Sequence, residues 1–225
     1  SKNKSGLKRS VKMAFWPGHS SGTYAGSTWY ADNLWEELYE NGLVFVHHDI
    51  PGKKGAGLPL QARIHSEVSR LVQTTVKEVT GKELQTRRWG RTGDQSFWGI
   101  GIPSFATAES YPPEVVKESG RGDWWWHTPE DTIDKVDVHN LEITLKADAT
   151  AIMRICNSPI LPYEFMSVAD DFVNELQELQ KKAEKTFDLT PLLRKAESLK
   201  KETTELNATI RKTQQECREL EELWG

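Results

Sequence analysis

Short apolar runs alternate with segments of helical period over the first two thirds of the chain. Three apolar runs predict strands: residues 11–16, 43–46 and 101–108. Three longer segments have apolar residues at a helical period: residues 27–39, 60–79 and 140–156. Because strands alternate with helices, we expect an α/β domain, a partial three-layer fold in which helices flank a mostly parallel sheet.

The last third of the chain has a different pattern, which begins after two prolines near residue 160. Apolar residues recur at alternating steps of four and three over residues 165–183 and again over residues 192–224. Between these segments, Thr190-Pro191 is typical of a helix start. The pattern predicts an α-helical hairpin. The expected division is an α/β domain at residues 1–158 and a helical domain at residues 159–225.

The second arm of this hairpin is long, about 33 residues or about 50 Å at the helical rise. One hairpin cannot bury an apolar stripe of that length by itself. The stripe must pack on the α/β domain, on a partner chain, or on both, and we favour a partner.

Composition narrows the class of protein. The chain has 225 residues, of which 37% are hydrophobic and 28% are charged, so we expect a modest core and a strongly solvated segment. A net charge of -4 gives no reason to expect nucleic acid as a partner. No apolar run approaches the roughly 18 residues that span a bilayer. The basic, polar first ten residues are typical of the end of a preceding helix, so we expect a piece of a longer protein.

Polar residues just past the predicted strands are the first candidates for a site, because ligands in α/β folds bind at the carboxyl ends of strands. His19 follows the first strand, and His47-His48-Asp49 follows the second. His47 and Asp49 would share one face of a strand and could bind one metal ion together. Alternatively, Asp49 alone faces the site, or the segment is a solvated strand end.

A second group of candidates surrounds three consecutive tryptophans, residues 124–126, which suit the walls of a pocket better than one face of a helix or strand. His127 follows Trp126, with acidic residues close by, and is a candidate metal ligand. The alternative is a buried cluster whose histidine only forms hydrogen bonds. The loop around Asp94 predicts the lip of a pocket, whereas His65 and His139 are expected to be surface or structural.

Four segments together resemble one family, the M28 zinc peptidases, over residues 11–157. They are FWPGHSSGTYAGSTWYADN, VFVHHDIPGKKGA, GDQSFWGIGIPS and WWWHTPEDTIDKVD. The branch that these segments resemble most is that of glutamate carboxypeptidase II and the transferrin receptor. The final hairpin is similar to the helical dimerisation domain of that branch.

The resemblance implies two zinc ions held by a histidine, a bridging aspartate, a glutamate, a further acidic residue and a final histidine. The further acidic residue matches Asp49, which favours Asp49 alone over the pair with His47, and the final histidine matches His127. The family's adjacent general-base and ligand glutamates fall at His19-Ser20. The first histidine and the bridging aspartate belong to a His-x-Asp segment that is not in these 225 residues.

The resemblance therefore implies a zinc metallopeptidase of the amino- or carboxypeptidase type, acting on peptides and forming a homodimer through its last helices. Only two of five expected ligands are present, and a catalytic zinc needs about three protein ligands. We expect this chain to be inactive as given. The alternative is a non-catalytic, transferrin-receptor-like protein that serves binding and dimerisation.

Overall fold

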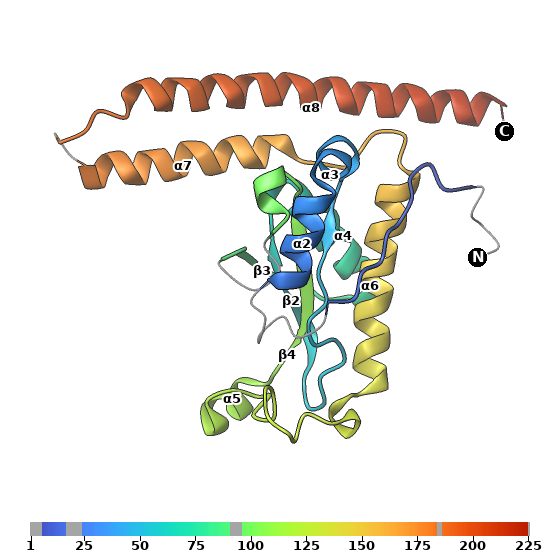
Figure 1. The fold of residues 1–225 in the computed structure, drawn as a ribbon. Coiled ribbons are helices and arrows are strands. Elements are labelled where there is room, and N and C mark those ends of the chain that lie inside the picture. The colour runs from blue at the N-terminus through green and yellow to red at the C-terminus, as the bar shows by residue number, and fades with distance from the viewer. Residues whose placement is uncertain (1–5, 17–23, 91–95, 184–185, 225) are drawn as a thin grey trace. The chain divides into compact units, whose positions relative to one another are not determined.

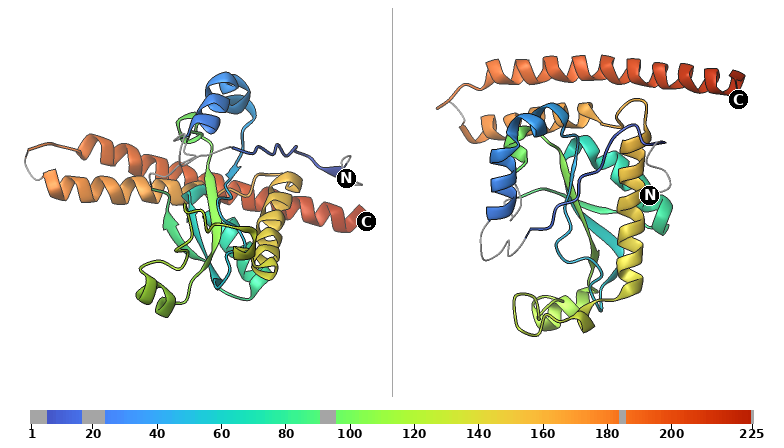
Figure 2. Two further views of the ribbon diagram at one scale, coloured as in Figure 1. Left: turned by 60° about the horizontal axis from the view of Figure 1, so that its bottom comes forward. Right: turned by 45° about the vertical axis from the view of Figure 1, so that its right-hand side comes forward.

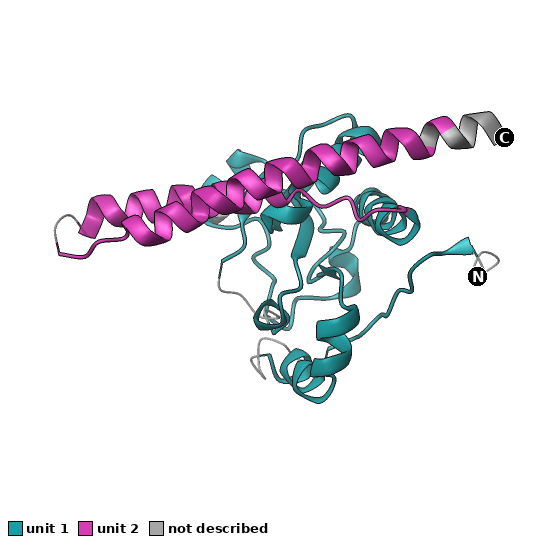
Figure 3. Cartoon of the chain, turned by 90° about the horizontal axis from the view of Figure 1, so that it is seen from above, with its two compact units in different colours: residues 1–157 teal, residues 158–225 magenta. Residues whose placement is uncertain are grey.

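The computed structural model describes residues 6–16, 24–90, 96–183 and 186–224 (Figure 1). The chain divides into two compact units, residues 1–157 and residues 158–225 (Figure 3). Each unit has its own arrangement of helices or strands, and they are described in turn.

The first unit is built on a four-stranded sheet with the order β1-β4-β2-β3. Its strands are β1 (Phe45–Val46), β2 (Gly57–Ile64), β3 (Gln85–Arg88) and β4 (Ser104–Ser110). β1 pairs with β4 and β2 pairs with β3 in parallel, whereas β2 and β4 are antiparallel. Two of the three pairings are thus parallel, and the mostly parallel sheet expected from the sequence is confirmed.

Two long helices, α4 (Ser66–Thr80) and α6 (Val138–Asn157), pack on each other and on strands β2 and β4 (Figures 1 and 2). α4 places apolar residues at helical spacing toward this core and ends at Gly81, whose left-handed backbone (φ 70°) closes the helix. The main core is made of fully buried side chains from the strands and both helices: Leu60, Val68, Val72, Val76, Phe105 and Ala151.

A second apolar cluster joins α2 (Ala25–Asn33) and α3 (Trp35–Asn41) to the short 3₁₀ helix η2 (Trp98–Ile100). Ala31, Phe97, Ile100 and Ile102 are buried there, and Trp16, Tyr30, Leu38 and Phe45 pack around them. The remaining short elements are α5 (Pro113–Ser119) and the 3₁₀ helix η3 (Ile133–Lys135). Helices therefore flank the sheet, as predicted.

The structure corrects several predicted elements. Residues 11–16 form no strand but run as irregular chain, although Trp16 packs in the second cluster. The helix expected over residues 27–39 is two helices, because the backbone leaves the helical region at Leu34 (φ -124°, ψ 26°).

The helix expected over residues 60–79 is in fact the end of strand β2 followed by α4. Leu60, Ala62 and Ile64 are buried while Gln61 and Arg63 between them are half-buried, which is the alternation of a strand. Leu60, Ile64 and Val68 lie four residues apart, so a strand that runs into a helix imitated one longer helical period. β3 and α5 were not predicted.

The second unit is the predicted hairpin, made of α7 (Phe165–Ala183) and α8 (Thr190–Trp224). Side-chain contacts set the antiparallel register of the two helices. Asn207 Nδ2 donates to Glu164 Oε1 at 2.7 Å, and Lys200 lies 2.6 Å from the Asp170 carboxylate. At the other end, Gln180 accepts the Leu189 N–H at 2.6 Å.

Candidate functional site

Of the residues singled out from the sequence for the site, the structure describes His47, Asp49, Trp126 and His127. His19 and Asp94 lie outside the described residues, as does Ser20. The geometry of the site therefore concerns the end of β1 and the loop that carries the tryptophans.

The end of β1 is anchored to its neighbours on two sides. The His47 N–H donates to the Phe105 carbonyl at 3.0 Å, which extends the ladder with β4 by one residue. The His47 ring packs against Phe45, with centroids 5.8 Å apart, and against Trp89 at 6.2 Å. His48 lies on the side of α6, where its Nε2 is 3.2 Å from Asp148 Oδ2. Asp49 follows and is exposed.

A group of buried polar residues lies under the end of β1, and sequence reasoning missed it. Asp148 on α6 and Glu109 on β4 are each 1% exposed. The Thr107 hydroxyl donates to Asp148 Oδ2 at 2.6 Å, and the Thr144 hydroxyl donates to Glu109. The available signal was the polar pair Thr107 and Glu109, which occupy inward positions of a strand.

Burial acts on the pKa values of this group. It raises the pKa of Asp148 to about 7, an effect that the Thr107 hydrogen bond opposes and the Glu109 charge reinforces. Burial also lowers the pKa of His48, as does the neighbouring His47, while Glu109 raises it. Desolvation thus disfavours the charged form of both partners in the His48–Asp148 contact.

Glu109 fixes the loop that follows Asp49. Its carboxylate accepts the N–H groups of Gly52 at 3.0 Å and Lys53 at 3.4 Å. Asn140 of α6 donates to the carbonyl groups of Lys53 and Ala56. The loop is therefore held from both the sheet and the helix, so its position relative to the end of β1 is well defined.

Lys53 connects this loop with the tryptophan-bearing segment. Its ammonium group lies 5.2 Å from the centre of the Tyr111 ring, and Tyr111 contacts Trp125 edge to face at 6.3 Å. Burial lowers the pKa of Lys53, while the charges of Asp123, Glu109 and Asp49 raise it. Asp49 and Asp123 thus both act electrostatically on one buried lysine.

His127 has an unusual conformation, with a backbone φ of 63° in the left-handed region. Its ring stacks on Trp126, with centroids 3.4 Å apart, and the Arg121 guanidinium lies 4.3 Å from the Trp126 ring centre. Arg121 is oriented by a 2.6 Å bond to Asp123. A non-glycine residue at positive φ is costly and is often found at functional sites.

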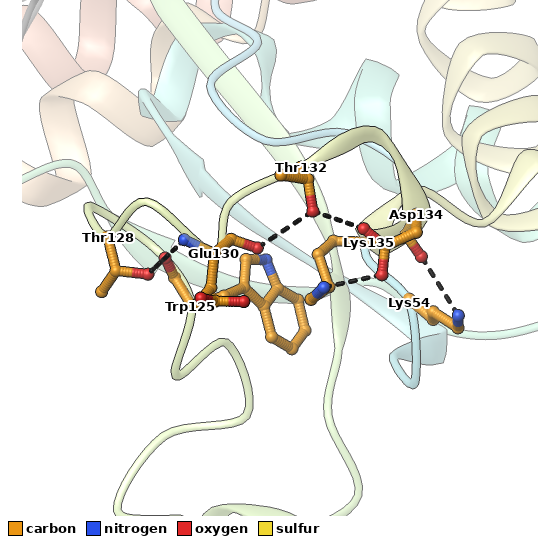
Figure 4. Close-up of polar contacts among 7 residues, drawn as sticks. All are labelled: Lys54, Trp125, Thr128, Glu130, Thr132, Asp134 and Lys135. Atoms are coloured by element: carbon orange, nitrogen blue, oxygen red, sulfur yellow. Dashed lines mark hydrogen bonds and ion pairs between the residues drawn. The ribbon is translucent and has the colours of Figure 1, made fainter.

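Threonine hydroxyls shape the segment after His127 (Figure 4). Thr128 donates to the Trp125 carbonyl at 2.6 Å and accepts the Glu130 N–H at 3.2 Å. Thr132 bonds the Glu130 carbonyl and the Asp134 carboxylate, and Lys135 binds the same carboxylate at 2.7 Å. The threonines of the HTPEDT sequence thus stabilise the loop that presents His127.

The described residues do not complete a metal site. Over the described ranges, no group of three or more His, Cys, Asp or Glu side chains is arranged to hold a metal ion. Asp49 and His127 are both exposed and could each supply one ligand. Since a catalytic zinc needs about three protein ligands, these residues alone do not fit the group.

His65 has the structural role expected for it. It stands between β2 and α4, and its Nδ1 accepts the Ser104 N–H at 2.9 Å.

Among the described helices, none combines the length and apolar character needed to cross a membrane.

No family model and no curated protein matches the chain. Comparison with solved structures finds proteins of similar fold. An aminopeptidase from Aneurinibacillus sp. strain AM-1 matches with 25% identity and a TM-score of 0.50, covering 64% of this chain and 33% of that one. Legionella LapA matches with 13% identity and a TM-score of 0.50, covering 66% and 43%. BSAP, a zinc aminopeptidase from Bacillus subtilis, has 21% identity, a TM-score of 0.48 and coverage of 61% and 34%.

The chain therefore spans less than half the length of these proteins. The predicted resemblance to the M28 zinc peptidases is confirmed in the fold. The finer assignment to the branch of glutamate carboxypeptidase II and the transferrin receptor stays a prediction.

Proposed function

We propose that this chain is part of an M28-like zinc exopeptidase acting on peptides, to which it contributes Asp49 and His127 as metal ligands. The observation that carries the proposal is the structural likeness to an aminopeptidase over 64% of the chain. The sequence resemblance puts the family's ligand positions at these two residues. Burial lowers the pKa of Lys53, while the charges of Asp123, in the tryptophan-bearing loop, and of Asp49 raise it, so both carboxylates lie in the neighbourhood of one lysine.

In a site completed by other residues, Asp49 and His127 would help to hold zinc, and the metal would supply Lewis-acid activation of water. The described residues would contribute binding and orientation to such a site. Tyr111 and Trp125 support the tryptophan loop, and Trp126 positions the His127 ring by stacking. Asp94, in the loop that the sequence predicts as a pocket lip, is proposed to border the same site. Because the ligand set is incomplete, the 225-residue chain by itself carries no hydrolytic step.

His19 stands at the family's general-base position, where an imidazole could exchange protons near neutral pH. Ser20 stands at a ligand position, and a serine hydroxyl is a poor replacement for a glutamate carboxylate on zinc. A longer protein that includes the upstream His-x-Asp segment is thus proposed to have an altered peptidase site.

The test is peptide hydrolysis by such a longer protein, with free-amine and N-acylated peptides to separate aminopeptidase from carboxypeptidase action. Asp49→Ala and His127→Ala should each lower kcat/KM at least about a hundredfold, because loss of second-shell partners alone costs 10–100-fold. Asp32→Ala and His139→Ala are matched controls at exposed positions on α2 and α6. Unchanged activity in both site variants would remove the peptidase proposal.

The second candidate function is assembly without catalysis, and the hairpin favours it. Phe165, Phe172 and Leu179 on α7 are 37–53% exposed, and so are Leu192, Leu199 and Leu206 on α8, at 37–47%. The Glu164–Asn207 bond sets the register, so each exposed residue of α7 lies level with one of α8. The resulting pairs are Phe165 with Leu206, Phe172 with Leu199, and Leu179 with Leu192.

These six residues, the hairpin stripe, recur every seven positions on each helix and all belong to the apolar seam predicted for the hairpin. The residues buried in the hairpin are smaller or polar, such as Ala169, Ala196 and Thr203. An exposed apolar stripe of this regularity fits a homodimer formed through these helices, because a symmetric dimer joins the same patch on both copies. A sedimentation run at micromolar concentration tests it, and a monomer would defeat it.

A further inference from the structure

We infer that Asp148 is a positioning residue: through His48 it holds the end of β1, so that the side chains of His47 and Asp49 are directed away from α6. The inference rests on the proposed function only in the role given to Asp49.

The first argument is the alternation of side chains along extended chain, in which residues two apart share a face. His48 contacts Asp148 on α6, which covers one face of the sheet. Phe45 packs in the second apolar cluster, and the His47 ring contacts Phe45 and Trp89. With His48 held on the helix side, its two neighbours point to the other side. Burial and the charge of Arg87 lower the pKa of Arg63, a residue that alternates with the buried Ala62, and the charge of Asp49 opposes this shift, which is consistent with Asp49 lying on the Arg63 side.

The second argument is that Asp148 is itself rigidly held. The Asp148 side chain is 2% exposed and accepts the Thr107 hydroxyl of β4 at 2.6 Å. Its Oδ2 thus joins α6, β4 and the end of β1 at one atom. Oδ1 is buried and has no hydrogen-bond partner among the described residues. A buried carboxylate with an unsatisfied oxygen costs free energy, so an apolar residue at this position would give a more stable helix. The contact with His48 is the role that accounts for an aspartate here.

The third argument is the shortness of the β1 ladder. β1 is two residues long, lies at one edge of the described sheet, and is followed by a bend at Asp49. Edge strands of that length are held weakly by their ladder. The His48–Asp148 contact supplies a side-chain anchor one residue before the proposed ligand, and such outer partners set ligand orientation in metal sites.

The test is amide hydrogen exchange on the 225-residue chain, which needs neither metal nor activity. The His47 N–H bonded to Phe105 reports on the end of β1, and the amides of β2 and β4 are the reference. Asp148→Leu and His48→Gln should each speed exchange at His47 about tenfold relative to the reference, the effect of one lost hydrogen bond. Combined, they should speed exchange at His47 no more than Asp148→Leu alone, because both remove the His48–Asp148 contact and only Asp148→Leu also removes the Thr107 hydrogen bond.

Asp148→Asn keeps an oxygen acceptor for His48 and Thr107, so it should retain the His47 protection of the natural chain. Thr75→Val is the matched control, because it removes an equally buried hydroxyl whose partners are the Leu71 carbonyl and Arg154 rather than His48 or Asp148. Should Asp148→Leu fail to fold, His48→Gln still decides, since the His48 side chain is 30% exposed. Three outcomes would each overturn the inference. They are equal changes in exchange at His47 and in the reference amides, additive effects in the double variant, and unchanged exchange at His47 in His48→Gln. None of these outcomes bears on zinc content or hydrolysis, which test the proposed function separately.

Discussion

Polar residues at inward positions distinguish the core of this chain from an ordinary apolar one. Thr107, Glu109, Thr144 and Asp148 are all buried, and each takes part in a hydrogen bond. The sequence predicted a strand at residues 101–108 but not the partners of these side chains, because they come from segments about 40 residues apart. Asp49 and His127 were candidates from their places in the sequence and received their separate ligand roles from the resemblance, whereas Asp148 and Lys53 needed the three-dimensional structure.

The raised pKa of Asp148 predicts a pH dependence of stability. The unfolded carboxyl group ionises near 3.8, while the folded one keeps its proton to about pH 7. Between these values the native state binds more protons, so the free energy of unfolding should fall as pH rises, by at most about 4 kcal/mol. The pKa of His48 is lowered in the folded state, so just below the ordinary histidine pKa the unfolded state binds more protons. There His48 should make the free energy of unfolding rise with pH.

Urea unfolding of the natural chain and of Asp148→Asn from pH 4 to pH 8 isolates the carboxyl group, because the variant has no proton to lose there. The natural chain should lose stability relative to the variant up to about pH 7 and stay level above it. A difference that does not change with pH would show that Asp148 ionises normally in the folded state.

The close packing of Gly122 predicts that a side chain at this position lowers stability. A Cβ at this position would overlap the Tyr111 ring, which supports Trp125. Gly122→Ala should therefore lower the free energy of unfolding by about 1–3 kcal/mol, as overpacking does, and shift the tryptophan fluorescence. Gly57→Ala is the control, since a Cβ there meets no atom within 4 Å. Equal stability of the two variants would contradict the packing described for this loop.

At the scale of elements, sequence patterns located the long helices well and the strands less well. α6, α7 and α8 follow clear periods over 19 to 35 residues, and all three were predicted. β2 was taken for a helix because its buried residues Leu60 and Ile64 are spaced like those of α4. β3 has four exposed residues and no apolar signal, so only its pairing with β2 identifies it as a strand.

The hairpin stripe gives a prediction for the helical unit. Phe172→Glu places a charge in the middle of the stripe and should weaken dimerisation about a hundredfold or more, since burying a phenylalanine contributes about 1.5–3 kcal/mol in each copy. Sedimentation equilibrium measures the change, and circular dichroism should show unchanged helix content. Gln177→Glu introduces the same charge at an exposed position of α7 outside the stripe and should remain dimeric. A dimer that tolerates Phe172→Glu would place the interface elsewhere.

For the whole molecule, the sequence predicted a division near residue 158, and the structure has two compact units that meet at residue 157. The fold class and the resemblance to M28 peptidases were within reach of sequence, because four motifs occur in a fixed order. The branch, the dimer and the ligand roles remain proposals. They depend on partners, metal ions and residues that neither a local pattern nor the described part of the chain contains.

The central claim is that Asp49 and His127 are two ligands of a two-zinc site that other residues complete. Zinc content after exhaustive dialysis tests it most directly. A longer protein with the upstream His-x-Asp segment should retain about two zinc ions per chain, and fewer after Asp49→Ala or His127→Ala, while the 225-residue chain should retain none. A longer protein without stoichiometric zinc, or one whose zinc is unchanged in both variants, would contradict the account.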